Sequence, residues 1–131
     1  GVVLCVSKKY RRGGMQMLSA ELLSFIVGNL IIKNMVDRLR PCQIDETVSL
    51  IVKIPFDSSF PSGHTLNGIT AAVTLMFIDK RMGIPAIVLA ILIAFSRMYN
   101  FMHFPTDVLA GAVLGVVSAV FVNFLFKRAG N

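Results

Sequence analysis

The sequence predicts an all-α protein, a polytopic bundle of transmembrane helices. Of its 131 residues, 55% are hydrophobic, which exceeds the apolar share of ordinary soluble domains. The apolar residues are gathered into four long runs, and such runs favour membrane helices over a globular core. A soluble helical bundle is the alternative, but four such runs in a short chain leave almost no polar face to cover them. The length allows one domain, covering residues 1–131.

Each run is interpreted as one span. The first, Met15–Ile32, is interrupted by polar residues, whereas the fourth, Val108–Phe126, is the cleanest. The second and third, Thr65–Ile78 and Ile84–Met98, are shorter than the roughly 20 residues of a full crossing, so they must include flanking residues. The apolar segment Gly1–Val6 is too short to cross. We expect it to be the end of an earlier helix.

The formal net charge of +6 predicts the topology. With four crossings, the basic segments fall on one side of the membrane, which the positive-inside rule makes cytoplasmic. The opposite side receives the long loop Asp37–Ser59, in which Thr47–Ile54 is apolar enough to lie on the membrane surface. Tyr10 is the one aromatic residue within the basic segments, too few for the repeated base stacking of single-strand binders, so nucleic-acid binding is not expected. The basic residues concerned are Lys8, Lys9, Arg11, Arg12, Lys80, Arg81, Lys127 and Arg128.

The first cluster of chemical interest places Lys33 seven residues before Arg40, at the outer end of the first span. On a helix this spacing is two turns, so both cations would share a face with about 10 Å between their backbones. Pro41 would end that helix. Such side chains could converge on one anion. Taken alone, however, the pair is more typical of cations that reach for lipid headgroups.

The second cluster, Pro61-Ser62-Gly63-His64, opens the second span. Ser62 can cap the helix and leave N–H groups pointing outward, and Gly63 lets a ligand approach the backbone. A helix start of this kind binds phosphate oxygens, and His64 beside the anion could protonate a leaving oxygen. By itself the motif fits an ordinary capped helix start with an interfacial histidine equally well.

The third cluster joins the end of the third span to the start of the fourth. Arg97 could bind two phosphate oxygens, and Pro105 suits the first turn of the fourth span. Asp107 follows His103 by four residues, a spacing at which a carboxylate can hold one ring nitrogen and leave the other free as a nucleophile. Stabilisation by the helix N-terminus alone would explain Asp107, but not His103.

A metal site is the alternative use of these residues, because His64, His103 and Asp107 could form a three-ligand set. The three nearby cations would repel a metal ion if they converge on the same place. They can also neutralise charge that develops on a phosphoryl group. We therefore expect no metal and no other cofactor.

Taken jointly, the three clusters resemble the signature of the type 2 phosphatidic acid phosphatase (PAP2) superfamily of lipid phosphatases. The family pattern is Lys, six residues, Arg-Pro; then Pro-Ser-Gly-His; then Ser-Arg, five residues, His, three residues, Asp. Here it is KNMVDRLRP from Lys33, PSGH from Pro61 and SRMYNFMHFPTD from Ser96, with every specified position matched. The resemblance covers about residues 28–126. Bacterial members of this type carry six membrane helices, so we expect the intact protein to have amino-terminal helices that this chain lacks.

The resemblance implies a two-step mechanism that needs no metal. His103 would attack phosphorus and form a phosphohistidine, Asp107 would orient it, and His64 would protonate the leaving group. Water would then release phosphate. The phosphate would be held by Lys33, Arg40, Ser62, Gly63 and Arg97.

On this basis we expect a multi-pass phosphatase of the cell membrane that acts on a lipid phosphate at the extracytoplasmic face. Undecaprenyl diphosphate is the favoured substrate, followed by phosphatidylglycerol phosphate or phosphatidic acid. Transfer of the phosphoryl group or headgroup to an acceptor other than water would fit the same motif. A non-catalytic anion-binding membrane protein is the alternative class, although such a protein has no need for the pairing of His103 with Asp107.

Overall fold

The computed structural model describes residues 1–45 and 57–130, and these residues form helices, turns and loops. The expectation that Thr47–Ile54 lies on the membrane surface falls outside the described residues. The prediction of an all-α fold is confirmed for the part of the chain that is described. The helices are α1 (Val2–Val6), α2 (Arg11–Ser24), the π-helix η1 (Phe25–Ile32), α3 (Lys33–Val36), α4 (Pro41–Ile44), α5 (Gly63–Ile78), α6 (Lys80–Tyr99) and α7 (Pro105–Arg128).

Each predicted span corresponds to a helical segment. The helical stretches Arg11–Ile44, Lys80–Tyr99 and Pro105–Arg128 are long and apolar enough to cross a membrane. Helix α5 has 16 residues, fewer than the roughly 20 of a full crossing. Helix α6 begins four residues before its predicted span, because the Asp79 side chain accepts a hydrogen bond from the Arg81 backbone N–H at 2.9 Å and caps the helix.

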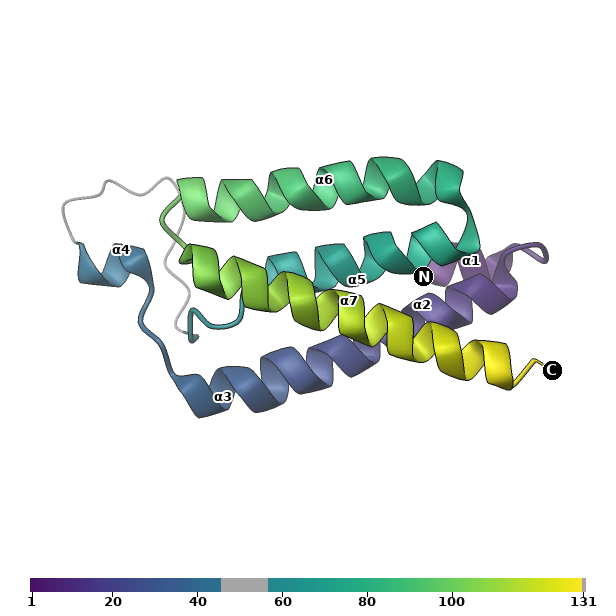
Figure 1. The fold of residues 1–131 in the computed structure, drawn as a ribbon, viewed down its shortest axis with the longest axis horizontal. Coiled ribbons are helices and arrows are strands. Elements are labelled where there is room, and N and C mark those ends of the chain that lie inside the picture. Colours follow the sequence, from purple (N-terminus) through teal and green to yellow (C-terminus); the bar gives the residue numbers. More distant parts are fainter. Residues whose placement is uncertain (46–56, 131) are drawn as a thin grey trace.

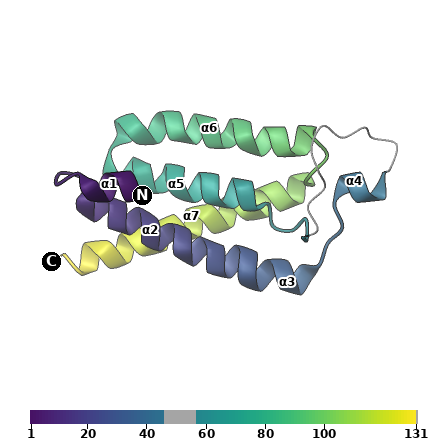
Figure 2. The same cartoon turned by 180° about the vertical axis from the view of Figure 1, so that it is seen from behind.

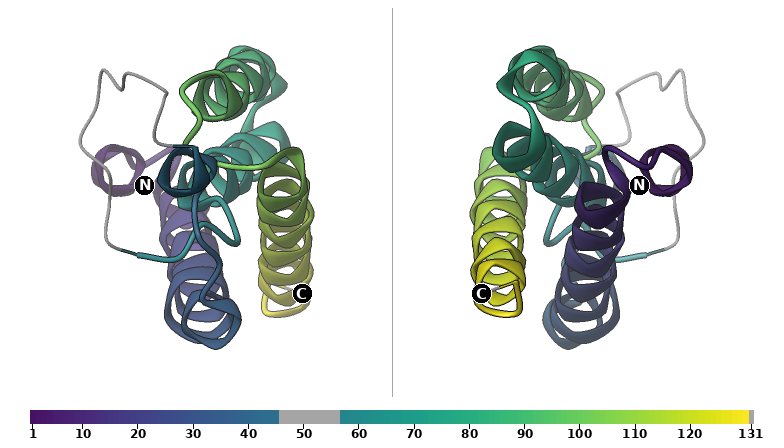
Figure 3. Two further views of the ribbon diagram at one scale, coloured as in Figure 1. Left: turned by 90° about the vertical axis from the view of Figure 1, so that its left-hand side faces the viewer. Right: turned by 90° about the vertical axis from the view of Figure 1, so that its right-hand side faces the viewer.

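Helix α5 is the centre of the bundle and contacts α2, α6 and α7. Figure 3 shows this arrangement from the two ends of the molecule. Helices α5 and α7 pack closely because α7 presents glycines there: a Cβ added to Gly111 would lie 2.7 Å from the Ser62 carbonyl oxygen, and one added to Gly115 would lie 2.8 Å from that of Leu66. Small residues spaced by four allow helix backbones to approach in this way.

The outward faces of α6 and α7 are apolar. Leu92 and Phe95 of α6, like Leu109 and Phe121 of α7, are exposed. In water such surfaces would be costly, whereas a lipid bilayer accommodates them without penalty. The distribution of exposed side chains therefore agrees with the predicted spans.

The helices run lengthwise, so the elements that carry the three sequence clusters meet at one end of the bundle. In Figure 1 this is the end at which α3 and α6 finish and α5 and α7 begin, beside α4. Figure 2 shows the same gathering from behind. Both chain termini lie toward the opposite end. Helix direction alone thus brings residues that are far apart in sequence to one rim.

Candidate active site

A cavity of about 670 Å³ opens at this rim. Its walls come from η1, α3, α5, the end of α6 and the loop that leads to α7. Six of the eight predicted site residues line it, and the two that do not are Ser62 and Asp107. The six are Lys33, Arg40, Gly63, His64, Arg97 and His103. Three cations and both histidines of the chain therefore face one space.

The backbone that places the Lys33 and Arg40 side chains close together differs from the predicted one. The expectation that both lie on one helix is wrong, because α3 ends at Val36 and Asp37 adopts a left-handed conformation with φ of 41°. Arg40 then has an extended backbone directly before α4. The turn brings its side chain back toward Lys33, and both cations bind the carboxylate of Asp57, at 2.5 Å from Lys33 Nζ and 2.7 Å from Arg40 Nη2.

His103 is held as a neutral imidazole with a defined tautomer. Its Nδ1 lies 2.8 Å from the carbonyl oxygen of Ser59, and a carbonyl can only accept, so Nδ1 carries the proton. The other nitrogen, Nε2, therefore carries the lone pair, which accepts a hydrogen bond of 3.3 Å from Arg40 Nη1. Burial, followed by the charge of Arg40, lowers the pKa of His103 to about 4. His103 is therefore neutral at pH 7, the protonation state that a nucleophilic imidazole requires.

Asp107 supports this histidine through an intermediate residue. Its Oδ2 lies 3.8 Å from His103 Nδ1, which is too long for a hydrogen bond. The same oxygen accepts a hydrogen bond of 2.5 Å from the Ser59 hydroxyl, and the carbonyl of Ser59 holds His103. The direct hydrogen bond expected from the spacing is thus replaced by a link through Ser59.

Further contacts hold the buried carboxylate of Asp107. Arg38 Nη1 lies 2.8 Å from its Oδ1, and the backbone N–H of Phe104 donates to Oδ2 at 2.9 Å. Asp107 therefore also accepts the backbone N–H of the residue that precedes α7, as an acid near a helix N-terminus can. The expected contact at the helix N-terminus is thus present, whereas the orienting of His103 by Asp107 stays a prediction, without the direct hydrogen bond that the spacing suggested.

The Pro61–His64 segment begins α5 as predicted, but its residues have different surroundings. Ser62 occupies the cap position without a side-chain capping bond. It is fully buried, and its hydroxyl accepts a hydrogen bond from Thr65 Oγ1 at 3.0 Å. Its backbone N–H donates to the Asp107 carbonyl at 3.0 Å, which ties the start of α5 to that of α7. Only Gly63 and the exposed His64 reach the cavity.

Arg97, in the last turn of α6, supplies the third cation. It lines the cavity, and its Nε is buried with no hydrogen-bond partner among the described residues. Buried polar groups are normally paired. Arg97 thus adds a third positive charge to the wall of the cavity.

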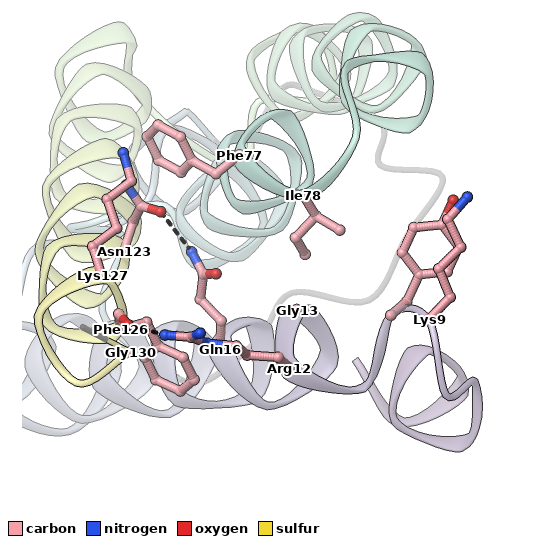
Figure 4. A pocket seen from close by; sticks show the side chains of 11 residues that line it. Lys9, Arg12, Gly13, Gln16, Phe77, Ile78, Asn123, Phe126, Lys127 and Gly130 are labelled. Carbon is pink, nitrogen blue, oxygen red and sulfur yellow. Dashed lines mark hydrogen bonds between the residues drawn. The ribbon is translucent and has the colours of Figure 1, made fainter.

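A second cavity, of about 620 Å³, lies at the other end of the bundle, near the C-terminus (Figure 4). None of the predicted site residues lines it. Gln16 and Asn123 form a hydrogen bond of 3.1 Å between α2 and α7 there, and Lys9, Arg12 and Lys127 surround it. These three residues belong to the basic segments from which the cytoplasmic side was predicted.

Comparison with known proteins identifies the family. The profile described as the PAP2 superfamily matches residues 13–130. The chain belongs to the PAP2 superfamily. The resemblance drawn from the three clusters is thereby confirmed.

Relatives with 35% identity include an undecaprenyl-diphosphatase of Sulfolobus acidocaldarius, over 86% of this chain and 55% of the relative. Another is the bacitracin transport permease protein BcrC of Bacillus licheniformis, over 79% of this chain and 48% of the relative. The chain thus spans about half the length of the curated relatives it matches.

Two solved structures have a similar fold. One is a transmembrane PAP2-type phosphatidylglycerolphosphate phosphatase from Bacillus subtilis, with a TM-score of 0.77 and 27% identity over 98% of this chain and 65% of that one. The other is LpxE from Aquifex aeolicus, with a TM-score of 0.81 and 27% identity over 93% of this chain and 72% of that one. Together with the apolar helices, these relatives establish a multi-pass membrane protein.

Several residues of this PAP2 site were not found from the sequence. Asn29 of η1 lines the cavity, Ser59 connects Asp107 to His103, Arg38 binds Asp107, and Asp57 binds two cations. Three of these lie in irregular segments, where no periodicity identifies a side chain's neighbours. The available signals were the intramembrane asparagine and the closeness of Asp57 and Ser59 to Pro61.

The alternative metal set is not assembled. Among residues 1–45 and 57–130, no group of three or more His, Cys, Asp or Glu side chains is placed to hold a metal ion. His64 and His103 line the cavity, while Asp107 is fully buried behind Ser59.

Proposed function

We propose that this protein is a membrane phosphatase that hydrolyses a lipid phosphate or diphosphate through a phosphohistidine intermediate. The observation that carries the proposal is the convergence of Lys33, Arg40 and Arg97 with both histidines on one cavity. Such a charge distribution matches a phosphate group. The chain also belongs to a superfamily whose named relatives include an undecaprenyl-diphosphatase, a phosphatidylglycerophosphatase and a lipid A 1-phosphatase, and this membership supports the same function.

In the first step, Nε2 of His103 attacks phosphorus and the bond from phosphorus to the leaving oxygen breaks. Protonated His64 gives its proton to that oxygen, so that an alcohol or a lipid monophosphate departs. Lys33, Arg40 and Arg97 stabilise the charge on the transferring phosphoryl oxygens, and the Gly63 N–H at the start of α5 is suited to contact them.

In the second step, water attacks phosphorus, the P–N bond breaks and inorganic phosphate leaves. The proton released by the water returns to His64. The charge-stabilising role often filled by a metal belongs here to the three cations, so the reaction is proposed to proceed without one.

The proposed substrate is a polyprenyl diphosphate such as undecaprenyl diphosphate, and the proposed face is extracytoplasmic. The substrate is supported by relatives that carry the name undecaprenyl-diphosphatase, from Sulfolobus acidocaldarius and Bacillus subtilis. The face is supported by the positive-inside rule, because the cavity lies at the end of the bundle opposite the basic segments.

A substrate panel tests the proposal. The full-length protein in detergent is assayed for phosphate release from undecaprenyl diphosphate, phosphatidylglycerol phosphate and phosphatidic acid, with and without EDTA and vanadate. We expect fastest release from the polyprenyl diphosphate, full activity in EDTA, inhibition by vanadate and loss of turnover in His103→Ala. Turnover that survives His103→Ala removes the assigned nucleophile, and turnover abolished by EDTA restores a metal. Anion binding without any turnover would indicate the non-catalytic class.

A further inference from the structure

The carboxylate of Asp57 occupies the place between two of the three cations. Its Oδ2 lies 2.5 Å from Lys33 Nζ and its Oδ1 lies 2.7 Å from Arg40 Nη2. Arg40 Nε also approaches the backbone carbonyl of Asp57, at 3.3 Å. Each carboxylate oxygen thus binds a different cation, as two oxygens of one phosphate group would.

The two sides of this ion pair differ in burial. The side chains of Lys33 and Arg40 are 11% and 3% exposed, whereas that of Asp57 is 52% exposed. Arg40 is further fixed by a hydrogen bond of 3.0 Å from its Nη1 to the Met102 carbonyl. The cations therefore belong to the wall of the cavity, and the acid reaches them from its solvent-facing mouth.

Two more donors in the same cavity are left for a larger anion. Arg97, whose Nε has no hydrogen-bond partner among the described residues, and the exposed His64 both line the cavity. Asp57 thus covers only part of the anion site. A phosphate group bound to all three cations would overlap the position of the carboxylate and repel its charge.

From these contacts we propose that Asp57 is an internal counter-ion that occupies the phosphate position in the empty site and leaves it when the substrate's phosphate binds. The inference rests on the function proposed above and adds a residue that the sequence motif does not specify. Competition of this kind lowers the binding affinity of every phosphate-containing ligand by the same factor. Asp57 therefore sets the KM for substrate and the inhibition constant for inorganic phosphate, but not kcat.

A physical reason exists for keeping such a group. A buried guanidinium with no anion nearby is costly, so the Asp57 carboxylate stabilises the empty site. Burial by itself would raise the pKa of Asp57, but hydrogen bonds from Lys33 and Arg40 and their charges outweigh this effect and lower the pKa. The counter-ion is therefore ionised at neutral pH. Its exposure to solvent leaves a route for it to swing out.

The test compares Asp57→Asn with wild type in the full-length protein. We expect KM for the lipid substrate and Ki for inorganic phosphate to fall together by about fivefold, equivalent to about 1 kcal/mol, with kcat unchanged. Asp57→Ala is expected to act in the same direction. The matched control is Asp37→Asn, which removes an acidic charge outside the cavity, at a left-handed position that asparagine tolerates. It should leave both constants at wild-type values.

Calorimetric titration with inorganic phosphate provides a readout that does not depend on turnover. Asp57→Asn should bind phosphate about fivefold more tightly than wild type. If KM and phosphate affinity are unchanged, or if both weaken because Asp57 holds the cations in place, the counter-ion role is wrong. A wild-type protein that hydrolyses none of the lipid phosphates would refute the proposed function, while the titration would still decide the role of Asp57.

Discussion

Ser59→Ala is the substitution that tests how Asp107 acts on His103. The Ser59 hydroxyl donates to Asp107 at 2.5 Å, and the carbonyl of the same residue accepts from His103 Nδ1 at 2.8 Å. The direct separation of the acid and the imidazole is 3.8 Å. Removing the hydroxyl therefore breaks the link to Asp107 but leaves the backbone contact that sets the tautomer of His103.

The expected magnitude follows from the remaining contacts. A hydrogen bond to a charged group contributes about 1.5–3 kcal/mol. Asp107 keeps its contacts with the Phe104 N–H at 2.9 Å and with Arg38 at 2.8 Å, so the loss should lie at the lower end, about 1.5 kcal/mol. If the lost hydrogen bond raises the activation free energy by that amount, kcat falls about tenfold.

The assay measures kcat, KM and thermal unfolding in detergent, with the lipid phosphate that the wild type hydrolyses best. Ser24→Ala is the matched control, because Ser24 is equally buried and its hydroxyl donates to the Glu21 carbonyl of its own helix. We expect the control to retain wild-type kcat. A double-mutant cycle with Asp107→Asn should be strongly non-additive, since both changes break the same link.

Two results would refute the reasoning. The first is a Ser59→Ala variant with the kcat of Ser24→Ala while Asp107→Asn is inactive, because Asp107 would then act directly on His103. The second is a cycle in which the two effects simply add, since independent sites behave in that way.

Two further predictions concern packing and pH. In Gly111→Ala the new Cβ would lie 2.7 Å from the Ser62 carbonyl oxygen, whereas in Gly68→Ala the new Cβ would lie 3.5 Å from Ala90 Cβ, an ordinary contact. Thermal unfolding should therefore show Gly111→Ala to be less stable than Gly68→Ala by about 1–3 kcal/mol. Equal stabilities of the two variants would contradict the close packing of α5 against α7. The pKa of His103 is lowered to about 4 in the folded protein. As the pH falls below about 6.5, His103 is therefore protonated in the unfolded chain but still neutral in the folded one. The contribution of His103 to stability is therefore complete above about pH 6.5 and is lost toward pH 4, with a magnitude on the order of 3 kcal/mol. Wild type should lose more stability than His103→Gln between pH 7 and pH 4.5, and parallel pH profiles would exclude a buried neutral imidazole.

The sequence by itself determined the elements of this protein and the end of the bundle at which its chemistry lies. Apolar runs predicted the helices, because lipid-facing segments must be continuous and hydrophobic. Pro105 marked the start of α7 and Ser62 that of α5, both as observed. Alternating helix directions then brought Lys33, Arg97 and His103 to one rim, an outcome that needs only the number of spans and their order.

The contacts between side chains were decided only by the tertiary structure. Lys33 and Arg40 were expected on one helical face, but the left-handed turn at Asp37 places them on separate segments. Asp57 and Ser59 lie in a loop, where no repeating geometry relates sequence spacing to neighbours in space. Helical periodicity operates over three or four residues, whereas the hydrogen bond from Ser59 to Asp107 joins positions 48 residues apart. Contacts of that range depend on how the loop packs against two helix starts, and this is a property of the assembled fold.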